Sequence, residues 1–138
     1  MTSRGPSRQV DRQYGLGRLA NARAFRRQAE NALALAARGD NANPIIASIV
    51  DAAIAYGDAV CALVGGRVHQ QDHGRAPQLL RAVLGNRLPG DQERRFRRLL
   101  GNRDDAHYGA RAGRLRTAEA LLEDLQLFAA WVDLVVGG

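Results

Sequence analysis

The sequence predicts an all-α protein, an up-and-down bundle of about five helices. Apolar residues recur at three- and four-residue steps in several long segments, and glycine, proline or asparagine stands between those segments. No segment alternates apolar and polar residues as a half-buried strand does. The length of 138 residues suits one domain with its own core. We therefore expect residues 1–16 to form a disordered basic arm and residues 17–138 to form a single helical-bundle domain.

The first predicted helix covers residues 18–38. Its apolar face includes Leu19 and Phe25, which stand at helical spacing, and Gly39 is a typical C-terminal stop. The preceding residues 1–16 mix serine, glycine, proline and arginine without a period. Such a composition is typical of a terminal arm that does not fold by itself.

The second predicted helix covers residues 44–64. Asn43 can cap the free amides of its first turn, the proline that follows suits the first helical position, and two glycines end it. The segment is apolar and long enough to cross a bilayer, but Asp51 and Asp58 lie inside it a heptad apart, which is expensive in lipid. We interpret the segment as a buried core helix and expect no membrane association.

Three further helices are predicted in the second half of the chain. A loop over residues 65–75 leads to a short helix over residues 76–84, which a glycine ends. Asp91 can cap the fourth helix, which runs to His107. The last helix covers residues 117–136.

The last helix carries two apolar stripes. The second stripe, formed by Leu127, Trp131 and Leu134, lies beside the main one and leaves only a narrow polar side. An extra stripe of this kind indicates a helix-to-helix contact between two copies, so we predict a homodimer with these three residues in its interface. The alternative is deeper burial of the same residues within the monomer, because a five-helix bundle can surround one central helix.

The charge of the chain is positive and unevenly distributed. All 20 basic residues are arginine, and the formal net charge is +6. Arginine binds phosphate or carboxylate through two parallel hydrogen bonds, so RNA or another polyanion is favoured, although charge-paired self-association and plain solubility fit the balance equally. If RNA binds, we expect Arg94, Arg95 and Arg98 of the fourth helix to neutralise its backbone phosphates. The alternative is a solvated face that acids of the last helix partly match.

The residues exclude several classes of chemistry. Lysine is absent, so the chain has no P-loop of the usual type. Three histidines, one cysteine and dispersed acids show no metal-ligand spacing, and we expect no metal and no cofactor. The single Cys61 cannot form an internal disulfide, and residues 1–10 lack the apolar stretch of a secretory signal. Both observations favour the cytoplasm.

Arg103 and His107 are the candidate catalytic residues. On a helix they stand one turn apart on the same face. A metal-independent ribonuclease needs a base for the ribose 2′-hydroxyl and a cation for the attacked phosphate, and this pair supplies both. In the alternative, structural interpretation, Arg103 pairs with Asp104, Asp105 or Asp58, and His107 caps the C-terminus of its helix.

Several short motifs along the chain resemble the HEPN superfamily. They are Asp51–Ala59, Gly66–Arg67, Asp72–His73, the helix that contains Leu79 and Leu80, Arg103–Tyr108, and the helix from Ala118 to Val132. Together they extend over about residues 18–136. The resemblance implies a small up-and-down helical bundle that is often dimeric. Some members are RNases or toxins, and others are inactive scaffolds, RNA binders or partners of nucleotidyltransferase-like proteins.

The resemblance also assigns roles to individual residues. RNase members carry an arginine, usually a polar neighbour, and a histidine after four to six intervening residues. Arg103, Asp104 and His107 match that order with three intervening residues, one fewer. Tyr108 and His73 also match family positions, and His73 has either a loop-ordering or a functional role. The shortened spacing favours a non-catalytic or weakly active module that binds RNA or an acidic protein partner. The alternative is a toxin-like, metal-independent endoribonuclease.

Overall fold

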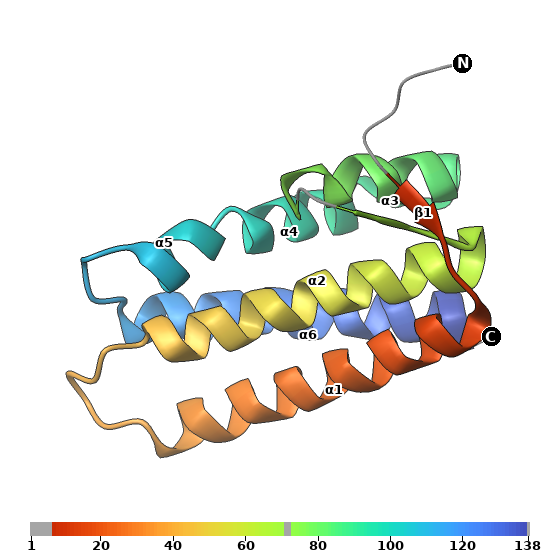
Figure 1. Cartoon of the computed structure of the whole chain (residues 1–138). Coiled ribbons are helices and arrows are strands. Elements are labelled where there is room, and N and C mark those ends of the chain that lie inside the picture. The colour runs from red at the N-terminus through yellow and green to blue at the C-terminus, as the bar shows by residue number, and fades with distance from the viewer. Residues whose placement is uncertain (1–6, 71–72, 138) are drawn as a thin grey trace.

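The structure is a computed structural model that describes residues 7–70 and 73–137, and it shows an all-α bundle (Figure 1). The α-helices are α1 (Arg12–Leu35), α2 (Asn43–Gly65), α3 (Ala76–Leu84), α4 (Gly90–Leu100), α5 (Arg103–Tyr108) and α6 (Leu115–Gly137). Two short strands, β1 (Ser7–Gln9) and β2 (Arg67–His69), and two 3-10 turns, His73–Arg75 and Gly85–Arg87, complete the order. The predicted helical-bundle class is confirmed.

Helix α2 is the centre of the bundle. It packs against α1, α3, α4, α5 and α6, and its side chains Ile49, Val50, Tyr56 and Val60 are fully buried. Removing an aliphatic side chain of this size from water stabilises a fold by about 1.5–3 kcal/mol. Among the described residues α2 is long and apolar enough to cross a membrane, but most of it lies inside the bundle. The interpretation of this segment as a core helix is confirmed.

A close contact joins α2, α4 and α6. In Figure 1, α3, α4 and α5 form a row above α2 and α6, and α1 lies below them. The rings of Phe96 on α4 and Phe128 on α6 stack, with centroids 5.0 Å apart and planes 6° apart. A Cβ at Gly57 of α2 would lie 2.5 Å from Cζ of Phe96. Glycine at this position therefore lets the stacked pair reach the central helix.

The N-terminal segment differs from the prediction. Residues 7–9 form β1, which pairs with β2 in antiparallel register, Arg8 opposite Val68. The backbone N–H of Val10 also donates to the carbonyl oxygen of Gly66 at 2.9 Å. Gly66 has a φ of +67°, which turns the chain out of α2, and Val68 is buried. The expectation of a disordered arm is therefore wrong for residues 7–16, and residues 1–6 lie outside the described part of the chain.

Helix α1 begins at Arg12, earlier than expected. Oδ1 of Asp11 accepts a hydrogen bond from the backbone N–H of Tyr14 at 2.9 Å, which is an N-cap. Gly15 made this stretch look like part of the arm, because glycine weakens a helix. In the structure Gly15 is buried, and a Cβ there would lie 2.7 Å from side-chain atoms of Leu63 on α2. Glycine is used here for close packing of α1 on α2.

The predicted fourth helix is split into α4 and α5. The break lies at Gly101 and Asn102, where the backbone N–H of Asn102 donates to Leu99 and its side-chain amide donates to Arg98 at 2.8 Å. The Asn102 side chain thus binds the carbonyl oxygen of Arg98. In a continuing α-helix this oxygen would accept a hydrogen bond from the backbone N–H of Asn102. As a result, α5 leaves the axis of α4, and its residues no longer continue the apolar face of that helix.

Candidate functional site

A surface cleft between α1, α2 and α5 brings the predicted Arg103 and His107 together. The cleft, called the α5 cleft below, has a volume of about 240 Å³. It is lined by Arg18 and Phe25 of α1, Asp51 and Ile54 of α2, and Arg103, His107 and Tyr108 of α5. The two predicted residues therefore share one cavity with charged groups from two other helices.

His107 contacts an acid of the central helix. Its Nε2 lies 3.4 Å from Oδ1 of Asp51, and both side chains are about one-third exposed. A neutral ring can donate its Nε2–H to the carboxylate, and an imidazolium forms an ion pair with it. His107 also stands in the last turn of α5, where the structural interpretation placed it. In either protonation state, Asp51 fixes the ring and leaves Nδ1 for another partner.

The contacts of the Arg103 guanidinium are weaker than the contact between His107 and Asp51. Its Nη1 lies 3.6 Å from Oδ1 of Asp104, and its guanidinium carbon lies 5.8 Å from the centre of the Tyr108 ring. Asp104 is almost fully exposed, so water screens this pair and it contributes little to stability. The predicted pairing with Asp104 is found, whereas Asp58 pairs with other residues. Arg103 can therefore exchange Asp104 for a stronger anion such as a phosphate.

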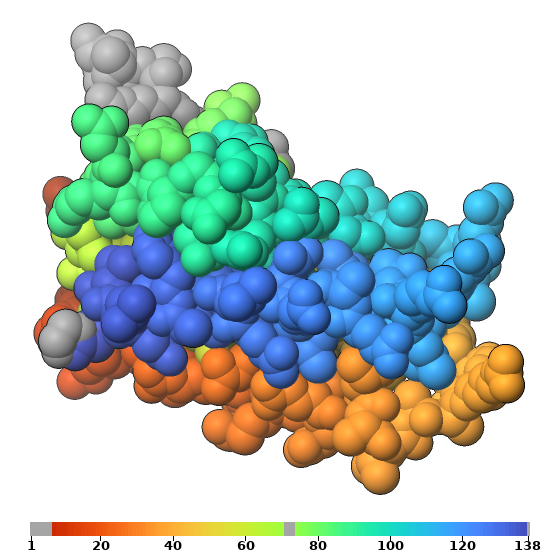
Figure 2. Space-filling model, turned by 180° about the vertical axis from the view of Figure 1, so that it is seen from behind, coloured from red at the N-terminus to blue at the C-terminus, as the bar shows by residue number. Residues whose placement is uncertain are grey.

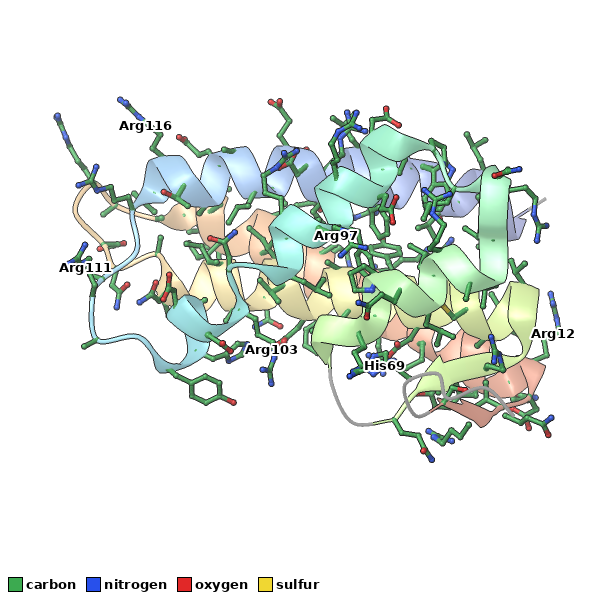
Figure 3. The ribbon with its side chains drawn as sticks, turned by 90° about the horizontal axis from the view of Figure 1, so that it is seen from above. Arg12, His69, Arg97, Arg103, Arg111 and Arg116 are labelled. Atoms are coloured by element: carbon green, nitrogen blue, oxygen red, sulfur yellow. The ribbon has the colours of Figure 1, made fainter. Side chains whose placement is uncertain are left out.

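Arg18 lines the cleft although no sequence motif marks it. Its Nε and Nη2 lie 3.2 and 3.1 Å from Oδ2 of Asp58, which is buried. The other oxygen of Asp58 lies 3.2 Å from Nε2 of His69, on β2. Figure 3 shows His69 and Arg103 along the same side of the molecule. The signal in the sequence is Asp58 itself, because an acid inside an apolar helix requires a cationic partner.

Tyr108 forms an exposed rim of the α5 cleft. The residue is 73% exposed, and its ring centre lies 5.9 Å from that of His107. The exposed ring lies beside cationic groups, with the guanidinium carbon of Arg103 5.8 Å from its centre. It offers a flat surface on which a nucleobase can stack.

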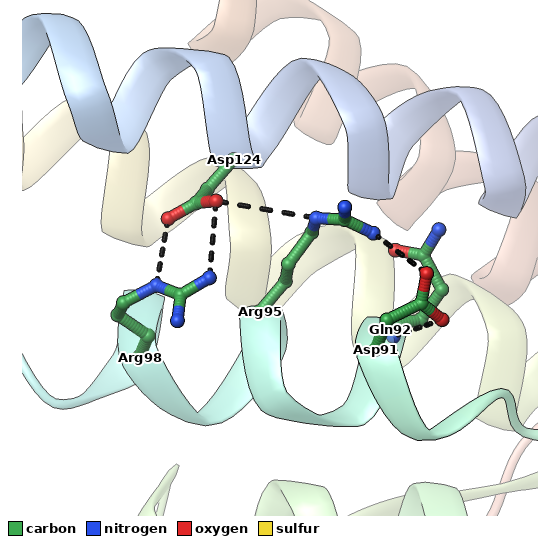
Figure 4. Close-up of polar contacts among 5 residues, drawn as sticks. All are labelled: Asp91, Gln92, Arg95, Arg98 and Asp124. Carbon is green, nitrogen blue, oxygen red and sulfur yellow. Dashed lines mark hydrogen bonds and ion pairs between the residues drawn. The ribbon is translucent and has the colours of Figure 1, made fainter.

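Two of the three predicted α4 arginines form ion pairs with acids of the same chain (Figure 4). Arg98 binds Asp124 of α6 with two hydrogen bonds, of 2.8 and 3.2 Å, and these bonds raise the pKa of Arg98. Arg95 lies 3.4 Å from Asp91 and 4.0 Å from the same Asp124. Arg94 is exposed and has no ion pair within the described residues. The alternative of an α4 face matched by acids of the last helix fits Arg95 and Arg98.

The three predicted interface residues of α6 differ in exposure. Figure 2 shows α6 crossing an outer face of the bundle, between α1 and the row that contains α4. Leu127 and Leu134 are 45% and 79% exposed. Trp131 is half-buried, and its ring centre lies 5.6 Å from that of Phe128. The second stripe is thus partly exposed, and its aromatic member already packs on the core of the monomer.

Cys61, the acids and the other histidines do not form a second reactive or metal-binding site among the described residues. Burial raises the pKa of Cys61 to about 12, so its thiol stays protonated at neutral pH and is a poor nucleophile. Over the ranges 7–70 and 73–137, no three His, Cys, Asp or Glu side chains gather as they would around a metal. His73 begins a 3-10 turn, but its side chain and Asp72 lie outside the described part of the structure. The α5 cleft is therefore the strongest candidate site.

No protein-family model matches the sequence, and no curated protein matches it either. The resemblance to the HEPN superfamily therefore remains a prediction from short motifs.

Proposed function

We propose that this protein binds single-stranded RNA and that the α5 cleft receives its backbone. One observation carries the proposal: guanidinium groups from two different helices, Arg18 and Arg103, line the same cleft as His107, and the exposed ring of Tyr108 forms its rim. Planar guanidinium groups bind phosphate oxygens through paired hydrogen bonds. An adjacent aromatic ring adds stacking on a base.

The ion pairs of the cleft leave capacity for a phosphate. Asp58 occupies Nε and Nη2 of Arg18 and leaves Nη1 without a partner among the described side chains. The solvent-exposed pair of Arg103 with Asp104 is weak enough to be displaced. Arg18 can bind a phosphate through Nη1 while its Nε and Nη2 stay on the buried Asp58. Arg103 can bind the same phosphate after it releases Asp104.

A second function, metal-independent cleavage of RNA, is favoured by the contact between His107 and Asp51. In such a reaction Nδ1 of His107 takes the proton of the ribose 2′-hydroxyl, and the 2′-oxygen attacks phosphorus. Arg103 stabilises the negative charge of the pentacoordinate phosphorus. The 5′-oxygen leaves with a proton from water, and a 2′,3′-cyclic phosphate remains. The spacing of Arg103 and His107, one residue shorter than in the RNases that the sequence resembles, makes binding the preferred function.

The assembly belongs to the same proposal. We propose a homodimer through the outer stripe of α6, because Leu127 and Leu134 expose apolar surface there. The buried, unpaired Cys61 supports a reducing cytoplasm. From the resemblance to the HEPN superfamily we also propose a nucleotidyltransferase-like protein as a candidate partner.

RNA binding and cleavage in EDTA separate the two functions. The probe is a 20-nucleotide single-stranded RNA of mixed sequence with a fluorescent end label. We expect Arg103→Gln to weaken binding about tenfold, since a hydrogen bond to a charged group contributes about 1.5–3 kcal/mol. Arg27→Gln is the matched control, because Arg27 is exposed on α1 and outside the cleft. Equal affinity of the two variants would refute the binding site.

Cleavage is read from the same mixtures on a denaturing gel. Intact RNA after prolonged incubation is the result expected of a binding module. Shorter products that His107→Ala abolishes and Arg27→Gln retains would establish the nuclease instead. Products that survive in His107→Ala would indicate a contaminating enzyme and leave the binding comparison as the decisive result.

A further inference from the structure

A second cavity, called the end groove below, lies at the end of the bundle where α5 meets the start of α2. Its volume is about 510 Å³. Its wall comprises Asn43 and Ile46 of α2, Asn102 and Asp105 near α5, and residues 109–114 with Thr117. The two cavities lie on different faces of α5, because Arg103 and His107 line the α5 cleft while Asp105 and Ala106 line the end groove.

The loop over residues 109–114 is fixed against the α1–α2 connection. The side-chain amide of Asn43 donates to the carbonyl oxygen of Arg111 at 2.9 Å. The backbone N–H of Gly113 donates to Oδ1 of Asn41, and the N–H of Ala42 donates to the carbonyl oxygen of Gly113, both at 3.0 Å. Hydrogen bonds to residues 41–43 thus fix the backbone of the loop, while its arginine side chains are exposed to solvent.

Three arginines of this region carry uncompensated charge. Arg111, Arg114 and Arg116 are exposed, and no carboxylate pairs with them in the described part of the chain. Figure 3 shows Arg111 and Arg116 at the same end of the molecule. Arg95 and Arg98 of α4, by contrast, are bound to acids. The available positive charge therefore lies at the end of the bundle more than on α4.

We propose that Arg111, Arg114 and Arg116 form a second phosphate-binding surface for the same single-stranded RNA, an inference that rests on the proposed function of the α5 cleft. Arg111 and Arg114 line the end groove, and Arg116 follows them in the first turn of α6. The lining of the groove includes one carboxylate, Asp105, and two arginines. The balance of charge in the wall therefore favours an anion.

The lining of the end groove indicates what the surface recognises. The wall holds no aromatic ring to stack on a base, so it contacts the backbone and reads no sequence. Its apolar members are small apart from Ile46, whereas the centre of a protein interface needs large apolar or aromatic anchors. These features favour RNA over an acidic protein.

A single strand can reach both cavities. Helix α5 has six residues, so it is about 9 Å long. A strand that places one phosphate between Arg18 and Arg103 passes Tyr108 before it reaches the loop of Arg111. Tyr108 then stacks on a base between two phosphate-binding surfaces, and the affinity depends on RNA long enough to bridge them.

The test compares two double variants of the full chain by fluorescence anisotropy with the labelled 20-nucleotide RNA. One is Arg111→Gln with Arg114→Gln. The control is Arg12→Gln with Arg27→Gln, which removes the same charge from exposed, unpaired arginines of α1 within the described residues. We expect the first variant to lower the slope of log affinity against log salt by about 1.4, at about 0.7 for each lost contact with single-stranded RNA. Circular dichroism checks that both variants are folded.

Each outcome decides the inference. A reduced slope and about tenfold weaker binding in the end-groove variant alone would support it, and equal losses in the two variants would overturn it. If Arg103→Gln binds normally while the end-groove variant does not, the cleft proposal fails and the end surface stands. If only Arg103→Gln loses affinity, the cleft stands and the end surface fails. Binding of polyglutamate as tight as that of RNA would overturn the choice of RNA in favour of an acidic protein.

Discussion

The Asp51 carboxylate of α2 faces the His107 imidazole of α5 at 3.4 Å. Helix α5 contains no buried residue of its own, but it packs against the central helix, and the Asp51–His107 contact joins the two helices. The pair therefore does two things at once. It orients the imidazole in the α5 cleft, and it introduces a negative charge into a site that we propose for phosphate.

Asp51→Asn is expected to strengthen RNA binding. Asparagine keeps the shape of the side chain and can still accept a hydrogen bond from His107, but it removes the charge that repels phosphate. One charge at the edge of the site corresponds to roughly a two- to fivefold rise in affinity. Anisotropy titrations measure it, with Glu119→Gln, an exposed acid of α6, as the control. Weaker binding by Asp51→Asn would show that the carboxylate holds the site together more than it opposes the ligand.

Leu134→Glu is expected to produce a folded monomer if α6 forms the proposed dimer. The residue is largely exposed, so the change leaves the core intact and places a charge in the apolar stripe. Leu35→Glu is the control, because Leu35 is equally exposed at the end of α1. Trp131 is less suitable, since its ring packs on Phe128. Light scattering gives the mass, and a wild-type protein that already has the 15.0 kDa of one chain would end the dimer proposal.

Gly57→Ala is expected to destabilise the fold by about 1–3 kcal/mol, because the new methyl group overlaps the ring of Phe96. Gly17→Ala is the matched control on α1. Its Cβ would meet nothing within 4 Å, so replacing glycine inside a helix should stabilise the protein by up to about 1 kcal/mol. Urea denaturation measures both. Opposite signs are expected, and equal destabilisation would contradict the close approach of α4 to α2.

Stability should depend on pH through Glu93, which joins α3 to α4. Its carboxylate binds Arg81 and also contacts Arg97, at 3.4 Å. The hydrogen bond from Arg81 lowers the pKa of Glu93 below its ordinary value of 4.5. A lowered pKa in the folded state means that the contact stabilises the protein above pH 4.5 and that this stabilisation is lost as the pH falls through the lowered value.

Urea denaturation at pH 7 and pH 3.5 tests this dependence in the wild type and in Glu93→Gln. The glutamine variant lacks the titrating group, so it should lose less stability on acidification than the wild type. The difference should be about 1 kcal/mol or less, because Arg81 is well exposed and water screens the pair. An identical loss in both proteins would show that Glu93 titrates alike in the folded and unfolded states.

The local signals of the sequence predicted the long helices well. Asn43 with its following proline marks the start of the central helix, but the predicted cap is wrong, because the Asn43 side chain donates to the carbonyl oxygen of Arg111 instead. The apolar periods of α1 and α6 are unambiguous. The pairing of β1 with β2 was missed, because three-residue strands are too short for an alternating pattern. Asn102 was missed as a helix break for a related reason: its side chain competes with the backbone only in the folded geometry.

The site was predictable only in part. The helical spacing placed Arg103 and His107 on one face, and the structure shows that both line one cleft. Arg18 and Asp51 come from other helices, and a single sequence does not show which residues of distant segments meet. The same limit applies to the α4 arginines. Their spacing defines a basic face, but only the position of Asp124 on α6 shows that Arg98 is already bound.

RNA binding in the α5 cleft can be observed directly by NMR, in a titration of ¹⁵N-labelled protein with a single-stranded tetranucleotide RNA followed at the arginine Nε–H groups. We expect saturable shifts for Arg103 and Arg18, which line the α5 cleft, at RNA concentrations where the signal of Arg27 does not move. Unchanged Arg103 and Arg18 signals under conditions where the RNA is bound would rule out the α5 cleft and place the RNA on another surface.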